Sequence, residues 1–131
     1  MATVRLLSHA EASPDAQRVF DEIMRVRDVS DVNNFWKALA NSPALLQGIW
    51  SQVQQVMQPG ALDALTKELV YIAVSTINSC EYCVHSHTAA ARAKGMTDAQ
   101  HAELLAVIAL ASQTNALANS LRVPVDEAFK K

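Results

Sequence analysis

Residues 68–87 have the sequence ELVYIAVSTINSCEYCVHSH, which predicts two helices joined by a short turn. Apolar residues recur at helical spacing before Asn78-Ser79, and Asn and Ser commonly form turns. Glu68 precedes this turn and His87 follows it, at roughly 15 Å and 12 Å along their helices for a rise of about 1.5 Å per residue. We therefore expect the carboxylate and the imidazole to lie nearly level in an antiparallel hairpin.

The second helix of this hairpin carries both cysteines of the chain, Cys80 and Cys83. Cys83 and His87 are four residues apart, so they share a helical face, and the imidazole leans back toward the sulfur. A neighbouring base and a helix N-terminus both favour the thiolate, which is the nucleophilic form of cysteine. Glu68 would then orient His87, and His87 would take the proton of Cys83.

The cysteine spacing also permits a dithiol and disulfide cycle. Cys80 lies one turn before Cys83, close enough to attack an oxidised Cys83 after a small adjustment of the first turn. The helix N-terminus favours Cys80 as the more acidic thiol, whereas the histidine favours Cys83. These residues alone leave that choice open.

The rest of the chain predicts an all-α, single-domain bundle of about six to seven helices over residues 1–131. Gly and Pro are rare enough to mark helix ends, and no segment shows the sustained apolar alternation of a strand. We expect Arg92 and Lys94 in the last turn of the fifth helix, where positive charges interact favourably with the negative end of the helix dipole. The expected helices cover residues 14–27, 33–40, 43–58, 62–77, 80–95, 97–111 and 115–122.

Composition excludes several classes of protein. Half of the 131 residues are hydrophobic and 18% are charged, which is typical of a globular domain. The formal charge is −2, with acidic and basic residues interleaved, so we expect no nucleic-acid partner. The apolar runs are shorter than the ~20 residues of a membrane span, and no signal peptide is evident. We expect a cytoplasmic protein without a membrane partner.

The spacing of Glu68, Cys80, Cys83 and His87 resembles the alkyl hydroperoxidase D-like branch of the carboxymuconolactone decarboxylase superfamily. The resemblance covers residues 65–111 and includes the turn at Gly95. It implies an all-helical homo-oligomer, a trimer or a hexamer, that reduces hydroperoxides. It also implies a separate dithiol or lipoyl-type electron donor, so no bound cofactor or metal is expected.

The same resemblance implies a role for each site residue. Cys83 would form the sulfenic acid, Cys80 would resolve it, and Glu68 with His87 would relay protons. Tyr82 is a departure, because the best-known peroxidase members have histidine immediately before the second cysteine. A phenol, with its usual pKa of about 10, can hydrogen-bond there as an accessory group but does not shuttle protons near neutrality.

Two other interpretations fit the same residues, and two more are unfavourable. A zinc site could use Cys80, Cys83, His87 and a carboxylate, within a metal-binding or redox-sensing oligomer. A disulfide oxidoreductase could act on protein or lipoyl substrates. A thioredoxin fold is excluded, because no predicted strand precedes the cysteines, and lactone decarboxylation is disfavoured, because it is not defined by a redox cysteine pair.

Residues 1–58 carry no motif that indicates a function. Aromatic residues on apolar helix faces are much more often core than cavity lining. His85 lies two positions from His87 and therefore points to a different side of its helix. The aromatic residues considered in this way are Phe20, Trp36, Trp50 and Tyr71.

Overall fold

The computed structural model describes residues 1–130 and is all-helical, as predicted. Six α-helices and two short 3₁₀ turns make up the secondary structure, and residues 1–130 contain no strand. The helices group into two compact units, residues 1–58 and the described residues from 59 onward. Each unit has a buried cluster of its own. The single-domain organisation stays a prediction.

The first unit contains α1 (Pro14–Arg27), α2 (Asn34–Leu39) and α3 (Pro43–Met57). Two Ser-Pro pairs begin the longer helices, as the sequence predicts. The Ser13 side chain accepts a hydrogen bond from the Ala16 N–H, and Pro14 occupies the first helical position, where a missing N–H costs nothing. The end of α1 is Asp28, whose φ of 52° stops the helix in the left-handed region.

The core of this unit lies where α1 and α2 pack against α3. Trp36 and Trp50 meet edge to face, and the Trp50 Nε1–H donates to the Glu22 carboxylate at 3.1 Å. Phe20, Trp36 and Trp50 are all buried there, so these aromatic residues belong to the core of the first unit.

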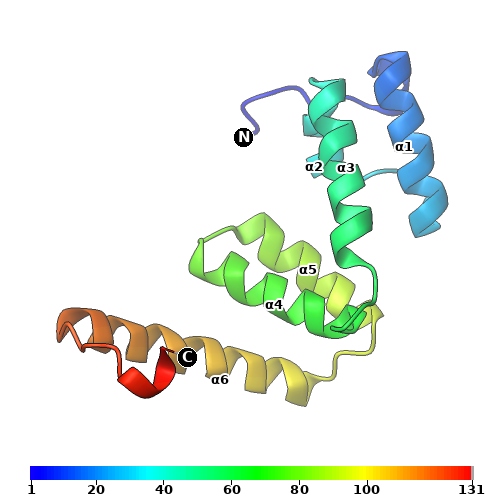
Figure 1. Cartoon of the computed structure of the whole chain (residues 1–131). Coiled ribbons are helices and arrows are strands. Elements are labelled where there is room, and N and C mark those ends of the chain that lie inside the picture. Colours follow the sequence, from blue (N-terminus) through cyan, green and yellow to red (C-terminus); the bar gives the residue numbers. More distant parts are fainter. Residues whose placement is uncertain (131) are drawn as a thin grey trace. The chain divides into compact units, whose positions relative to one another are not determined.

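The second unit contains α4 (Ala64–Ile77), α5 (Glu81–Ala93) and α6 (Asp98–Ser120). Asp63 caps α4 by accepting the Thr66 N–H. A turn at residues 78–79, with Ser79 at a φ of 55°, then reverses the chain, so that α4 and α5 lie side by side (Figure 1). Ile72, Ala91 and Met96 form the buried cluster of this unit.

One predicted helix boundary is wrong. Residues 97–111 and 115–122 were expected as separate helices, but α6 runs without a break from Asp98 to Ser120. Its start is as predicted, because Thr97 and Gln100 form a capping box. The polar residues after 111 do not interrupt it: the Ser112 and Thr114 hydroxyls donate to carbonyls one turn earlier, and no Gly or Pro intervenes.

Ile108 is the buried residue of α6 and Leu104 is partly buried, whereas Leu105, Val107, Leu110 and Leu117 are exposed. Although α6 has 23 residues, none of the helices described here is both long and apolar enough to span a bilayer.

Candidate active site

Glu68 is the centre of a hydrogen-bonded cluster between α4 and α5. Its side chain is 5% exposed, and both carboxylate oxygens accept hydrogen bonds from α5. Oε2 lies 2.7 Å from Nδ1 of His87, and Oε1 lies 2.9 Å from Nζ of Lys94. A buried carboxylate is stable as an anion only when it is paired in this way.

The charge state of Glu68 follows from two opposing effects. Burial penalises the anion and raises the pKa of this carboxyl, but the hydrogen bonds from His87 and Lys94, together with the positive charge of Lys94, lower it. The second effect is larger, so the pKa of Glu68 lies below its ordinary value. Glu68 is therefore ionised at neutral pH and accepts from both partners.

An ionised Glu68 determines which nitrogen of His87 carries the proton. Because a carboxylate only accepts, Nδ1 must be the donor, and Nε2 of the neutral ring is then an acceptor. The Tyr71 ring stacks on the imidazole, with centroids 3.5 Å apart and planes inclined by 19°. Carboxylate and phenol ring together hold the imidazole in one orientation and one tautomer, as a general base requires.

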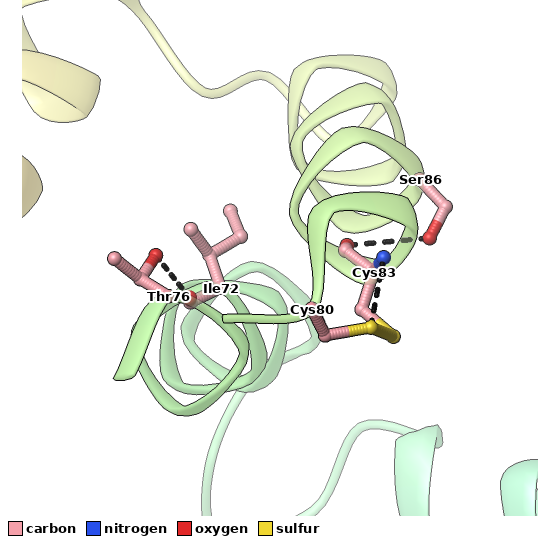
Figure 2. The surroundings of a disulfide bond; sticks show 5 residues. All are labelled: Ile72, Thr76, Cys80, Cys83 and Ser86. Carbon is pink, nitrogen blue, oxygen red and sulfur yellow. Dashed lines mark hydrogen bonds between the residues drawn. A yellow bond between two sulfur atoms is a disulfide. The ribbon is translucent and has the colours of Figure 1, made fainter. Parts of the chain in front are cut away.

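The two cysteines lie at the start of α5 and form a disulfide (Figure 2). Cys80 is the N-cap residue and Cys83 lies in the first turn, with their Cα atoms 5.3 Å apart. The Cys83 N–H donates to Sγ of Cys80 at 3.3 Å, so the sulfur satisfies one of the free amides of the helix start. Both residues are half-buried, so the disulfide is within reach of solvent.

The side chains of α5 divide the surroundings of the disulfide into two sides. At about 100° per residue, Cys83, His87 and Lys94 lie within about 40° of one another around the helix axis. Glu81 and His85 lie roughly 160° from Cys83. The face that carries Cys83 is therefore the face whose His87 and Lys94 contact Glu68, and the opposite face is separate from this cluster.

An open cavity of about 330 Å³ lies between the end of α4, the start of α5, and α6. Of the two cysteines, Cys80 is the one that lines it. The wall is predominantly apolar, and Val84 and Leu105 are its aliphatic side chains. The lining residues are Ser75, Thr76, Ser79, Cys80, Glu81, Val84, His85 and Leu105.

The structure brings together the residues that sequence analysis singles out, in two groups. Glu68 and His87 are in direct contact, and Cys80 is bonded to Cys83. Cys83 and His87 are one turn apart on α5, and the transfer of a proton between them stays a prediction. Tyr82 is exposed in the first turn of α5.

Sequence analysis did not assign two residues to this cluster. Lys94 was expected only to interact with the helix dipole, but it contacts Glu68. Tyr71 was considered only as a core or cavity-lining residue, but it contacts His87. The sequence did contain a signal that Lys94 belongs to this cluster. Lys94 follows His87 by seven residues, or about two helical turns, and therefore shares its helical face.

Within residues 1–130, no three His, Cys, Asp or Glu side chains converge in a way that could hold a metal ion. Both sulfur atoms are engaged in the disulfide, and the Glu68 oxygens face His87 and Lys94. The zinc interpretation therefore has no ligand set in this arrangement.

Comparison with known proteins shows the family of the chain. The model of the carboxymuconolactone decarboxylase family matches residues 43–126, which include both helices of the hairpin and all of α6. The chain belongs to this family. The resemblance found from the spacing of the four site residues is thereby confirmed.

Two relatives are similar to this chain in sequence over part of its length. An uncharacterised protein of the cox locus in Paracoccus denitrificans is 36% identical over 74 residues, which cover 55% of this chain and 67% of that protein. An uncharacterised protein of Cupriavidus necator is 31% identical over 80 residues, which cover 60% of this chain and 71% of that protein.

A solved structure matches the whole chain. The crystal structure of the alkylhydroperoxidase AhpD core from Rhodospirillum rubrum is 61% identical, with a TM-score of 0.96. The match covers 100% of this chain and 98% of that one, so it extends over residues 1–58 as well as the hairpin. This family member has the alkylhydroperoxidase core fold.

Proposed function

We propose that this protein is a thiol-dependent hydroperoxide reductase. One observation carries the proposal: a disulfide at the start of α5 lies one turn before a histidine that Glu68 holds in a single tautomer. A redox-active cysteine pair beside an oriented base is the arrangement that thiol peroxidation requires. The alkylhydroperoxidase name of the 61% identical crystal structure supports the same class of reaction.

The proposed cycle begins with the reduced dithiol. His87 takes the proton of Cys83, directly or through a water, and the thiolate attacks the terminal oxygen of the hydroperoxide. The O–O bond breaks, an alcohol leaves with the proton, and Cys83 becomes a sulfenic acid. The Cys80 thiol then attacks this sulfur, water leaves, and the disulfide forms. An external dithiol returns two electrons and two protons and completes the cycle.

Several properties of the protein are part of this proposal. The reductant is a dithiol or lipoyl-type donor, no bound cofactor takes part, and the protein works as a cytoplasmic homo-oligomer. Tyr82 stays an accessory residue, which can hydrogen-bond but does not replace an imidazole in proton transfer near neutral pH.

Stoichiometry and single variants test the proposed reaction. Reduced protein mixed with cumene hydroperoxide should lose two thiols per chain and release one equivalent of alcohol. Cys83→Ser should abolish turnover, whereas Cys80→Ser should accumulate a sulfenic acid that dimedone labels on Cys83. Turnover retained in Cys83→Ser would contradict the assignment of the two sulfur atoms.

The disulfide itself favours a second candidate, a disulfide oxidoreductase that handles peroxide only incidentally. Steady-state rates separate the two functions. A hydroperoxide reductase should turn over cumene hydroperoxide much faster than it transfers electrons from dihydrolipoamide to a second disulfide. The reverse order would favour the oxidoreductase.

A further inference from the structure

We propose that Lys94 is a positioning residue of this site: its ammonium group balances the charge of Glu68, so that His87 stays a neutral base. The observation that carries this inference is one nearly buried carboxylate shared by two side chains of α5 that can each carry a positive charge. The inference rests on the proposed function and deepens it, because it identifies what keeps the proposed base unprotonated.

A carboxylate with an imidazole as its only partner favours a different distribution of protons. An adjacent anion stabilises the imidazolium form, because opposite charges attract. The Glu68 side chain is almost completely buried, so water compensates little of its charge. Without a second cation, this anion would be balanced best by a protonated His87. A protonated ring has no acceptor nitrogen and therefore could not take the proton of Cys83.

Lys94 supplies the balancing charge from the other side of the carboxylate. Its Nζ lies 2.9 Å from Oε1 of Glu68, whereas His87 faces Oε2. The Lys94 side chain is 38% exposed, so its ammonium group keeps part of its hydration while it contacts a buried anion. Glu68 and Lys94 together are neutral, and the ammonium disfavours a second positive charge on the imidazole. The ring then keeps a single proton, on Nδ1, which it donates to Oε2.

Neighbouring groups on the three helices of this unit differ from Lys94 in carrying no positive charge. Tyr71 stacks on the imidazole from α4 through its phenol ring. Cys83, one turn before the imidazole on α5, is part of the disulfide or, after reduction, a thiol or thiolate. α6 contributes the apolar side chain of Leu104 to the adjoining buried cluster. Among these neighbours, Lys94 is the group that can balance the Glu68 carboxylate.

A role of Lys94 limited to the helix dipole would have different consequences. Arg92 lies in the last turn of the same helix, where its guanidinium donates to Asp98 at 2.7 Å. Both cations lie near the helix C-terminus and can interact with its negative end, but the hydrogen bond to Glu68 comes from Lys94. Arg92→Met is therefore the matched control for Lys94→Met, since each removes one positive charge from this helix end.

Nitrogen NMR of the oxidised, ¹⁵N-histidine-labelled protein at about pH 7.5 measures the charge of His87. Its signals are assigned by their loss in His87→Gln. Wild type and Arg92→Met should show a neutral ring with its proton on Nδ1, whereas Lys94→Met should show protons on both ring nitrogens. Lys94→Arg keeps the positive charge and should restore the neutral ring. A neutral ring in Lys94→Met would overturn the proposal.

A second substitution separates charge balance from local structure. Glu68→Gln removes the anion, so Lys94 no longer has a charge to balance. In the Glu68→Gln background, Lys94→Met should leave His87 neutral, although the same change protonates the ring when Glu68 is present. A protonated ring in the double variant would show that Lys94 acts on His87 without Glu68, and it would contradict the proposal.

Reaction of the reduced protein with cumene hydroperoxide gives the corresponding kinetic test. Lys94→Met should lower the rate at neutral pH by about tenfold and shift the rise of the rate to higher pH by about one unit, because the base is unprotonated only there. Lys94→Arg should restore the wild-type profile, and Arg92→Met should keep it. A lower rate at every pH, without a shift of the profile, would indicate a merely structural role and would overturn the proposal.

The charge of His87 is measured without hydroperoxide, so the two proposals can fail separately. If the protein consumes no hydroperoxide but Lys94→Met protonates the ring, the role of Lys94 stands and the proposed function fails. If hydroperoxide is consumed with the expected stoichiometry but Lys94→Met leaves both the ring and the pH profile unchanged, the proposed function stands and the role of Lys94 fails.

Discussion

Glu68 has no spare acceptor oxygen, and this determines how its side chain acts on the site. His87 and Lys94 each occupy one oxygen of a nearly buried carboxylate. Loss of the carboxylate charge would leave the ammonium group without its anion and the imidazole free to change tautomer. Substitutions at Glu68 therefore affect both the orientation of the base and the stability of the hairpin.

Alkylation of Cys83 tests the relay in the Cys80→Ser background, where Cys83 is the only thiol. Glu68→Gln and His87→Gln should each raise the pH at which iodoacetamide reacts rapidly, because the thiolate loses its oriented base. His85→Gln is the matched control, since His85 lies on the opposite side of α5. A pH profile that is the same in all three variants would argue against a relay.

Acid unfolding tests the charge state of Glu68. The pKa of Glu68 is lower in the folded protein than in the unfolded chain, so ionisation stabilises the fold above the ordinary glutamate range. This contribution should be lost as pH falls below about 4.3 and through the lower folded value. Glu68→Gln should lower the free energy of unfolding at pH 7 by about 2 kcal/mol.

Urea denaturation at pH 7 and at successively lower pH measures this difference. The gap between wild type and Glu68→Gln should narrow as the pH falls, because the native carboxylate becomes protonated. Glu103→Gln, an exposed acid on α6, should change the unfolding free energy by much less. A gap that stays constant with pH would contradict the ionised state of Glu68.

The prediction of single residues succeeded where the spacing of residues along a helix determines their position. It failed where the position of a side chain depends on contacts between helices. Glu68 and His87 were expected at the same level of a hairpin, and they are in contact. Tyr71 was not assigned because stacking depends on the rotation of α4 against α5, which periodicity does not fix. Lys94 was not assigned because an exposed lysine near a helix end commonly has only a dipole role.

At the scale of elements, chain reversals depend on a few residues with unusual backbone angles. Gly95 follows the end of α5 with a φ of 93°, where a side chain would be strained although no atom lies within 4 Å of its position. Gly48 lies inside α3, with open space around it and no such φ. A side chain would therefore have room at both glycines, and only the backbone angle φ distinguishes them.

Alanine at these two glycines should change stability in opposite directions. Gly95→Ala should lower the free energy of unfolding by about 1 kcal/mol, from backbone strain. Gly48→Ala should raise it by roughly 0.5–1 kcal/mol, from helix propensity. Equilibrium denaturation followed by circular dichroism measures both changes. Stabilisation by Gly95→Ala would show that the turn does not need its positive φ.

Helix starts were predicted well because capping is local. Ser13-Pro14 and Thr97 with Gln100 mark their helices within a few residues of sequence. The break predicted after residue 111 was wrong, because the hydroxyls of Ser112 and Thr114 bond within the helix and do not interrupt it. Gly or Pro is the usual sequence signal for the end of a helix, and residues 111–115 contain neither.

At the scale of the whole molecule, α6 leaves a large amount of apolar surface in water. Contiguous exposed apolar surface on a water-soluble helix commonly marks a protein interface. Ile108 is its buried residue, whereas aliphatic side chains along its length are 46–63% exposed. These exposed side chains are Leu105, Val107, Leu110 and Leu117. We expect this surface to contribute to the proposed homo-oligomer.

Sedimentation equilibrium tests self-association through α6. Wild-type protein should sediment as a trimer or a hexamer at micromolar concentration. Leu117→Glu should weaken assembly by about tenfold or more, because it places a charge on the apolar surface. Gln113→Glu adds the same charge at a polar position of the same helix and should have a smaller effect. A wild-type monomer at all concentrations would contradict the expectation.

The placement of both cysteines within one turn of α5 also bears on folding. The entropy that a crosslink removes from the unfolded chain increases with the size of the loop it closes, and three residues of separation close a very small one. Electron transfer at this site should therefore alter thermal stability far less than a crosslink between distant segments would. We therefore expect the rest of the architecture to stay folded when the pair is oxidised or reduced.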